Sequence, residues 1–239
     1  TMIPLAGPAN KQGRIAANNI AGASEAYEGT QGTSIAKVFD LAAASTGANE
    51  KALNKKGLAK GKDYETVIIT QNSHASYYPG STPMILKLIF SMDGKKIYGA
   101  QIVGNEGVDK RIDTIAVTMR LGGSVTDLKT LELAYAPPYS SAKDPVNMAG
   151  FVAENLLTGK VAFAPWDIDI TDEKVVALDV REDAELEAYA LPSYKQIPLG
   201  QLRGRLSELD KDSAIVTFCA IGVRSYNAAR TLMENGFKN

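Results

Sequence analysis

The sequence predicts two joined domains of different class: an α+β domain with an antiparallel sheet and flanking helices, then an α/β domain with a parallel sheet. Three observations predict this. The 239 residues are 45% hydrophobic, which is enough to bury two small cores. Residues 1–160 carry 17 basic and 14 acidic side chains, whereas residues 161–239 carry 9 and 13. Strand patterns are joined by a tight-turn signal in the first part and alternate with helix patterns in the second. We place the boundary near residue 162, just before Pro165 interrupts regular structure.

The first part is expected to be helix, strands, hairpin and helix in that order. Residues 8–21 read as a helix that opens with Pro8 and stops at Gly22. Strands are expected at 35–41 and 66–70. The runs 85–92 and 97–103 flank Asp93-Gly94, which favours a hairpin because this dipeptide tolerates the positive φ of a tight turn. Helical spacing follows over 108–121 and 146–157.

The second part alternates strand and helix. Strands are expected at 174–180 and 214–218, and helices at 182–190 and 225–235. Both strands are almost continuously apolar, which is typical of a parallel sheet covered on both faces. The expected architecture is therefore a three-layer α/β domain.

Composition excludes several function classes. A net charge of −1 gives no general reason to bind nucleic acid or an anionic membrane, and the cluster Lys51, Lys55, Lys56, Lys60 and Lys62 is interpreted as the solvated face of a helix and its exit loop. No apolar run approaches the ~20 residues of a membrane span, and no signal peptide is expected, so we predict a cytoplasmic protein. One cysteine and one histidine exclude a metal site built on several such ligands. No glycine-rich dinucleotide loop or Walker A motif occurs.

Cys219 is the main candidate for chemistry. It directly follows the strand 214–218, at the carboxyl end where open α/β sheets form their ligand crevices. We expect the backbone N–H groups of the loop to surround the sulfur, with Gly222 supplying conformational freedom and Arg224 a positive charge. The loop residues between Cys219 and Arg224 are Ala220, Ile221, Gly222 and Val223. Thiol-dependent phosphatases resemble this arrangement but use a longer loop, so sulfur transfer is favoured. The alternative is a buried, inert thiol.

The second part resembles a rhodanese domain. The resemblance rests on Leu178-Asp179-Val180-Arg181, on Ile197-Pro198-Leu199, on the loop from Cys219 to Arg224 and on the segment 225–232. It implies that Cys219 carries sulfane sulfur, that the loop cradles the persulfide, and that Asp179 and Arg181 help to hold the loop. Because such domains normally continue with a further strand and helix, the rhodanese-like domain at 167–239 is expected to be truncated.

The first part resembles the carboxyl-terminal portion of FAD-dependent pyridine nucleotide-disulfide oxidoreductases, in the coenzyme A-disulfide reductase branch. Residues 7–22 look like the end of the FAD-binding domain, assigned to 1–30, and the resemblance implies that Pro8, Ala9 and Asn10 lie near the flavin. The segments 49–57, 74–80 and 135–140 resemble the dimerisation domain, assigned to 31–161.

In this branch, tyrosines cross the dimer interface towards the partner's redox cysteine and the disulfide substrate. Tyr77 and Tyr135 match best, and Tyr78 and Tyr139 match less closely. The alternative for each is an aromatic that packs a turn beside Pro or Gly. His74 is interpreted as a hydrogen-bonded loop residue.

The resemblance implies a fragment of a homodimeric flavoprotein. The intact protein would use FAD and NAD(P)H to reduce CoA disulfide, CoA persulfide or polysulfide, with CoA as a further ligand and Cys219 passing sulfur. The chain alone is expected neither to hold FAD nor to oxidise NAD(P)H. The sequence leaves open NADH against NADPH, and CoA disulfide against polysulfide. Two alternatives stay open: a non-catalytic dimerisation and docking module, and a thiol site like those of phosphatases or arsenate reductases.

Overall fold

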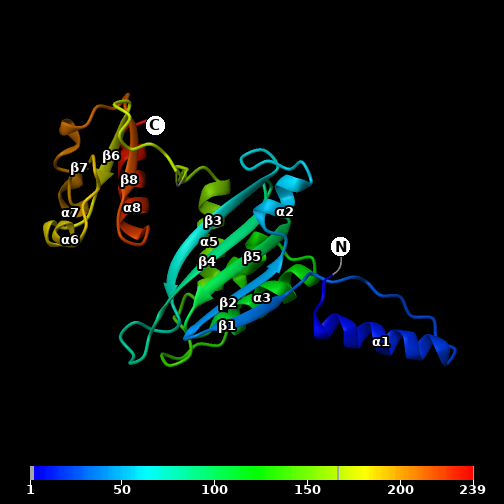
Figure 1. Ribbon diagram of the computed structural model, residues 1–239. Helices are drawn as coiled ribbons and strands as arrows, with labels where there is room; N and C mark the ends of the chain where they lie inside the picture. Colours follow the sequence, from blue (N-terminus) through cyan, green and yellow to red (C-terminus); the bar gives the residue numbers. More distant parts are fainter. Residues whose placement is uncertain (1–2, 166, 239) are drawn as a thin grey trace. The chain divides into compact units, whose positions relative to one another are not determined.

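The computed structural model describes residues 3–165 and 167–238, so the predicted domain limits at 1 and 239 lie outside the described residues. The chain divides into two compact units, Thr1–Glu154 and Asn155–Asn239 (Figure 1). The first is α+β with an antiparallel sheet and the second is α/β with a parallel sheet, which confirms the predicted fold class.

The first unit is built on a five-stranded sheet in the order β1-β2-β5-β4-β3, with antiparallel pairs throughout. The strands are β1 (Ser34–Val38), β2 (Leu41–Gly47), β3 (Tyr64–Asn72), β4 (Pro83–Ser91) and β5 (Ile97–Gly104). The predicted hairpin is present: β4 and β5 pair, and Gly94 between them has φ 69°. Long strands β3, β4 and β5 carry the buried apolar side chains of the core, among them Leu86 and Ile102.

One expected strand is wrong. Residues 35–41 form two strands, because the chain turns at Phe39-Asp40 and β1 pairs antiparallel with β2. Phe39 has φ 52° and is 93% exposed, so a bulky residue occupies a turn position that glycine or asparagine normally takes. The alanines of β2 have weak strand propensity, which leaves packing against β5 to determine this strand.

The helices of the first unit are α1 (Ala6–Ile20), α2 (Glu50–Lys55), α3 (Val108–Arg120), α4 (Val125–Thr130) and α5 (Pro145–Leu157). α3 contacts β2 and β5, with Ile112 and Ile115 buried. α4 was not expected from sequence; it begins with a capping box in which Ser124 and Asp127 satisfy each other's backbone N–H groups. The lysine cluster lies on α2 and the loop after it.

The second unit has a parallel sheet in the order β7-β6-β8. Its elements are β6 (Val175–Asp179), α6 (Asp183–Ala188), β7 (Lys195–Gln196), α7 (Leu199–Leu202), a 3-10 turn (Leu206–Glu208), β8 (Ala214–Phe218) and α8 (Val223–Glu234). Leu178, Val180, Ile197 and Leu202 are fully buried in its core. The carboxyl end of β8 therefore stands next to the end of β6, and Cys219 follows it directly.

Within residues 3–165 and 167–238, none of the helices has the length and apolar character that a membrane crossing requires.

Candidate functional site

The Cys219 loop joins β8 to α8. Cys219 is 7% exposed, and the chain turns above it at Gly222, which has φ +95° and is the residue just before the first turn of α8. The Gly222 N–H donates to Cys219 Sγ at 3.2 Å, and the Ser225 N–H donates at 3.3 Å. The thiol thus lies against the amino end of a helix, where backbone N–H groups and the helix dipole favour negative charge.

The loop lowers the pKa of Cys219. Burial raises this pKa, but the Ser225 hydroxyl and the N–H groups of Ser225, Ile221 and Gly222 together outweigh burial, and the net pKa lies below the ordinary value of 9.0. The Ser225 hydroxyl lies 3.5 Å from the sulfur. A thiol whose pKa is lowered has more of the thiolate form, which is the nucleophile.

The structure shows which residues of the loop reach the sulfur. The N–H groups of Gly222 and Ser225 donate to the sulfur, and the Cys219 thiol donates to the hydroxyl oxygen of Ser225, a residue that sequence reasoning did not single out. Ala220, Ile221 and Val223 are exposed on the outer side of the loop.

Arg224 forms a salt bridge with the carboxylate of Glu185. Its Nη1 and Nη2 atoms donate to Glu185 of α6, both at 2.6 Å, and this bidentate pair lowers the pKa of Glu185 to about 2 and raises that of Arg224. The expectation was a positive charge serving the sulfur. Across the described part of the chain, the side-chain hydrogen bonds of Arg224 go to Glu185, so its charge acts on Cys219 through space.

Asp179 and Arg181 form a buried ion pair at the end of β6. Arg181 Nη2 donates to Asp179 Oδ2 at 2.7 Å and to the Tyr189 carbonyl at 2.8 Å. The guanidinium carbon of Arg181 lies 5.1 Å from the ring centre of Phe218, the residue before Cys219. The pair therefore lies against the strand end from which the loop starts.

In the first unit, the structure brings Tyr77 and Tyr135 together. They are 58 residues apart in sequence, yet their hydroxyl oxygens lie 3.3 Å apart. Tyr77 is 75% exposed and Tyr135 is 49% exposed. The hydrogen bond with Tyr77 raises the pKa of Tyr135, because a bond that the Tyr135 hydroxyl donates stabilises the neutral phenol. Two phenol hydroxyls thus lie within hydrogen-bonding distance of each other at the surface.

The neighbouring candidates differ. Tyr78 and Tyr139 are exposed, and Tyr78 packs edge-on against His74. His74 is buried: Nδ1 lies 3.1 Å from Ser73 Oγ and Nε2 lies 3.2 Å from the Pro79 carbonyl. His74 is therefore a hydrogen-bonded loop residue.

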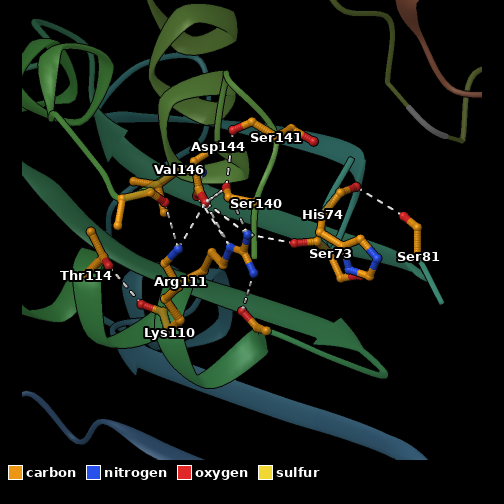
Figure 2. Close-up of polar contacts among 12 residues, drawn as sticks. Ser73, His74, Ser81, Lys110, Arg111, Thr114, Ser140, Ser141, Asp144 and Val146 are labelled. Carbon is orange, nitrogen blue, oxygen red and sulfur yellow. Dashed lines mark hydrogen bonds and ion pairs between the residues drawn. The ribbon is translucent and has the colours of Figure 1, made fainter. Parts of the chain in front are cut away.

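Figure 2 shows a buried arginine, Arg111, that makes polar contacts with Ser73, Ser140 and Asp144. Arg111 of α3 is 1% exposed and binds Asp144 through Nε and Nη2, with the shortest contact at 2.9 Å. The same Nη2 donates to the Ser73 carbonyl at 2.8 Å and to Ser140 Oγ at 3.3 Å. Ser73 precedes the loop of Tyr77, and Ser140 ends the loop of Tyr135. Sequence reasoning missed this network, because its members lie on three separate segments.

Comparison with known proteins assigns both units. Residues 33–145 match the family of the pyridine nucleotide-disulphide oxidoreductase dimerisation domain, and residues 168–239 match the rhodanese-like domain. Residues 33–145 and 168–239 are therefore similar, in that order, to a pyridine nucleotide-disulphide oxidoreductase dimerisation domain and to a rhodanese-like domain.

The proteins to which the chain is similar carry the names of redox enzymes. The coenzyme A disulfide reductases of Staphylococcus epidermidis and Staphylococcus aureus are 39% and 40% identical over 153 residues, which is 64% of this chain and 34% of theirs. The crystal structure of reduced Bacillus anthracis CoADR-RHD has a TM-score of 0.94 and 51% identity. That of a NAD-dependent persulfide reductase from A. fulgidus has a TM-score of 0.90 and 39% identity. Each structure covers 100% of this chain, and the chain covers 42% of each.

The oxidoreductase family implies FAD and NAD(P)H. Pro8, Ala9 and Asn10 lie near the start of α1, which has no buried residues, and the Asn10 amide donates to the Ala6 carbonyl within the same helix. No glycine-rich phosphate loop occurs in the sequence. These residues therefore do not fit a flavin by themselves. Among the described residues, no cluster of three or more His, Cys, Asp or Glu side chains could hold a metal ion.

Proposed function

We propose that this chain is the dimerisation and sulfur-carrying part of a flavoprotein that uses NAD(P)H to reduce CoA disulfide, CoA persulfide or polysulfide. The observation that carries the sulfur-transfer part is the buried Cys219 sulfur, which accepts hydrogen bonds from two backbone N–H groups and has a lowered pKa. The named activities of the similar proteins, coenzyme A disulfide reductase and persulfide reductase, support the redox part.

The sulfur step is a displacement at a sulfane sulfur. The Cys219 thiolate attacks the outer sulfur of an organic persulfide, R–S–SH. The bond between its two sulfurs breaks, RS⁻ leaves, and Cys219 becomes a persulfide, Cys219–S–SH. The thiol of Cys219 releases one proton to solvent when it forms the thiolate, and RS⁻ takes up one proton from solvent. No net oxidation or reduction occurs in this step. The N–H groups of Gly222 and Ser225 hold the negative charge on the attacking sulfur before transfer.

The tyrosines serve a separate step in a homodimer formed through residues 31–161. When a disulfide is reduced, one sulfur leaves as a thiolate and needs a proton. The Tyr77–Tyr135 pair is exposed and hydrogen-bonded, so one phenol can donate its proton while the other stabilises the oxygen left behind. Light scattering on the chain tests the dimer: a mass of twice 25.5 kDa is expected, and a monomer contradicts it.

Sulfur loading tests the proposal directly. The chain is incubated with polysulfide, separated from excess reagent, and its intact mass is measured by mass spectrometry. We expect the mass of one added sulfur atom, lost on treatment with dithiothreitol and absent in Cys219→Ser. An unchanged mass in the wild-type chain, with a thiol that alkylates only slowly, would instead favour the dimerisation and docking module.

A further inference from the structure

A cluster of buried polar groups, drawn in Figure 2, takes no part in the proposed chemistry. Its centre is Arg111, whose guanidinium binds partners in three segments. Nη1 donates to the Gly107 carbonyl at 3.1 Å, just before α3. Nη2 donates to the Ser73 carbonyl at 2.8 Å, and Nε and Nη2 donate to Asp144, just before α5. A buried arginine with this many acceptors fixes the relative positions of the segments that supply them.

Two of those three segments lead into the loops that carry Tyr77 and Tyr135. Ser73 lies four positions before Tyr77, and Ser140 lies five positions after Tyr135. Ser140 is itself within the cluster, because its hydroxyl donates to Asp144 at 2.6 Å and accepts from Arg111. Arg111 therefore contacts the beginning of one tyrosine loop and the end of the other.

Two further contacts join the loops around the same point. Lys110, the neighbour of Arg111, donates to the Ala134 carbonyl at 3.4 Å, directly before Tyr135. The Ala75 N–H donates to the Ser140 carbonyl at 3.1 Å, which links the loops to each other. Both tyrosine loops thus accept hydrogen bonds from side chains of α3, namely Lys110 and Arg111.

We propose that Arg111 is a positioning residue for the Tyr77–Tyr135 pair: its guanidinium holds both loops so that the two hydroxyls meet. This inference rests on the proposed function for the role of the pair in proton transfer, although the geometric part concerns the loops alone. A Lys at this position keeps the charge and can still face Asp144. It lacks the planar fork that reaches the Ser73 and Gly107 carbonyls at the same time.

The test follows the ionisation of Tyr135 in the whole chain. Tyrosine labelled with ¹³C at Cζ reports each phenol by NMR, and Tyr77→Phe and Tyr135→Phe assign the two signals. The pKa of Tyr135 is raised by Tyr77, so Tyr77→Phe is expected to lower it. We expect Arg111→Lys to lower it to the value seen in Tyr77→Phe, and Ser140→Ala to lower it in part.

A matched control separates positioning from general stability. Lys129→Met removes the Lys129–Glu154 ion pair, which lies in the same unit and shares no partner with the hydrogen bonds of Arg111. This variant is expected to lower the melting temperature and leave the Tyr135 titration unchanged. If Arg111→Lys loses the native tyrosine signals altogether, Ser140→Ala, which keeps the Arg111–Asp144 pair, decides the question.

Three results would overturn the inference. One is a wild-type Tyr135 titration in Arg111→Lys, or in Ser140→Ala where that variant decides, with only the melting temperature lowered. Another is a Tyr135 shift in Lys129→Met as large as that in Arg111→Lys. The third is a Tyr135 titration that ignores Tyr77→Phe, since there is then no hydroxyl pair to position. None of these results concerns sulfur on Cys219, so failure here and failure of sulfur loading are distinguishable.

Discussion

The two candidate sites are built by opposite means. The Cys219 loop surrounds its sulfur with groups from residues 221–225, all within six positions of the thiol. The tyrosine pair depends on side chains far apart in sequence, and Arg111 and Asp144 beneath it are separated by 33 residues. A site made from a local backbone turn forms once its strand and helix form. A site made from distant loops depends on a buried ion pair. We expect a change in the Arg111–Asp144 pair to alter the geometry of the exposed tyrosines.

The largest effect is expected where the distant network is broken. Asp144→Ala leaves the Arg111 guanidinium buried at 1% exposure without its carboxylate. Breaking a buried pair in this way costs about 3–5 kcal/mol. Thermal unfolding followed by circular dichroism measures the loss. Glu50→Gln is the control, because its pair with Lys87 is partly exposed and its removal costs about 0–1 kcal/mol. Equal losses in the two variants would remove the contrast between a buried and a partly exposed pair.

Acid weakens the same network without mutation. Burial raises the pKa of Asp144, but the Ser140 hydroxyl, the Val146 N–H and Arg111 outweigh it, and the net pKa lies below 3.8. Because the folded pKa is lowered, the stability from this group is fully present above pH 3.8 and is lost as the pH falls through the folded value. The melting temperature of the wild type is expected to fall towards that of Asp144→Asn over this range. Parallel curves for the two proteins would show that Asp144 does not titrate there.

A change in the local backbone turn is expected to cost less. Gly222 has φ +95°, and a Cβ there meets no atom within 4 Å, so Gly222→Ala adds backbone strain rather than a clash. The free energy of unfolding is expected to fall by about 1–2 kcal/mol. Alkylation of Cys219 is expected to slow, because the N–H of residue 222 turns away from the sulfur. Gly200→Ala on α7 is the control, since its Cβ also meets nothing and its φ is ordinary. A Gly222→Ala chain as reactive and as stable as this control would contradict the role of the turn.

Removing one side-chain hydroxyl at the thiol tests how far the backbone alone suffices. The Ser225 hydroxyl helps to lower the pKa of Cys219. Ser225→Ala keeps the backbone N–H but removes the hydroxyl, so the pKa of Cys219 is expected to rise. The pH dependence of the alkylation rate gives the pKa of Cys219. Ser213→Ala is the control, because Ser213 lies at the opposite end of β8 from Cys219. No shift would mean that the backbone N–H groups suffice alone.

The smallest effect is expected at the rim of the loop. The side chains of Arg224 and Glu185 are 29% and 35% exposed. Because the pKa of Glu185 is lowered from 4.5 to about 2, its contribution is present above pH 4.5 and lost as the pH falls towards 2. Glu185→Gln should therefore melt slightly below the wild type at neutral pH and approach it in acid. Glu187→Gln on the same helix is the control, and an equal change there would show that the Arg224 pair contributes nothing.

Sequence reasoning succeeded where structure is local. Asp93-Gly94 marks a hairpin by its own chemistry, and a cysteine after an apolar strand marks the end of a parallel sheet. It failed at Phe39, where no residue signals a turn, because pairing with β2 overrides the local preference. Arg111 gave no signal either: one arginine on an amphipathic helix reads as exposed until Ser73 and Asp144 are placed around it.

The central claim is that the loop makes Cys219 a nucleophile, and the pH dependence of its alkylation tests this most directly. Cys219 is the only cysteine of the 239-residue chain, so the rate of reaction with iodoacetamide reports this thiol alone. We expect the midpoint of the rate profile to lie below the ordinary value of 9.0. A midpoint at or above 9.0 would contradict the account, because burial would then outweigh the hydrogen bonds of Gly222 and Ser225.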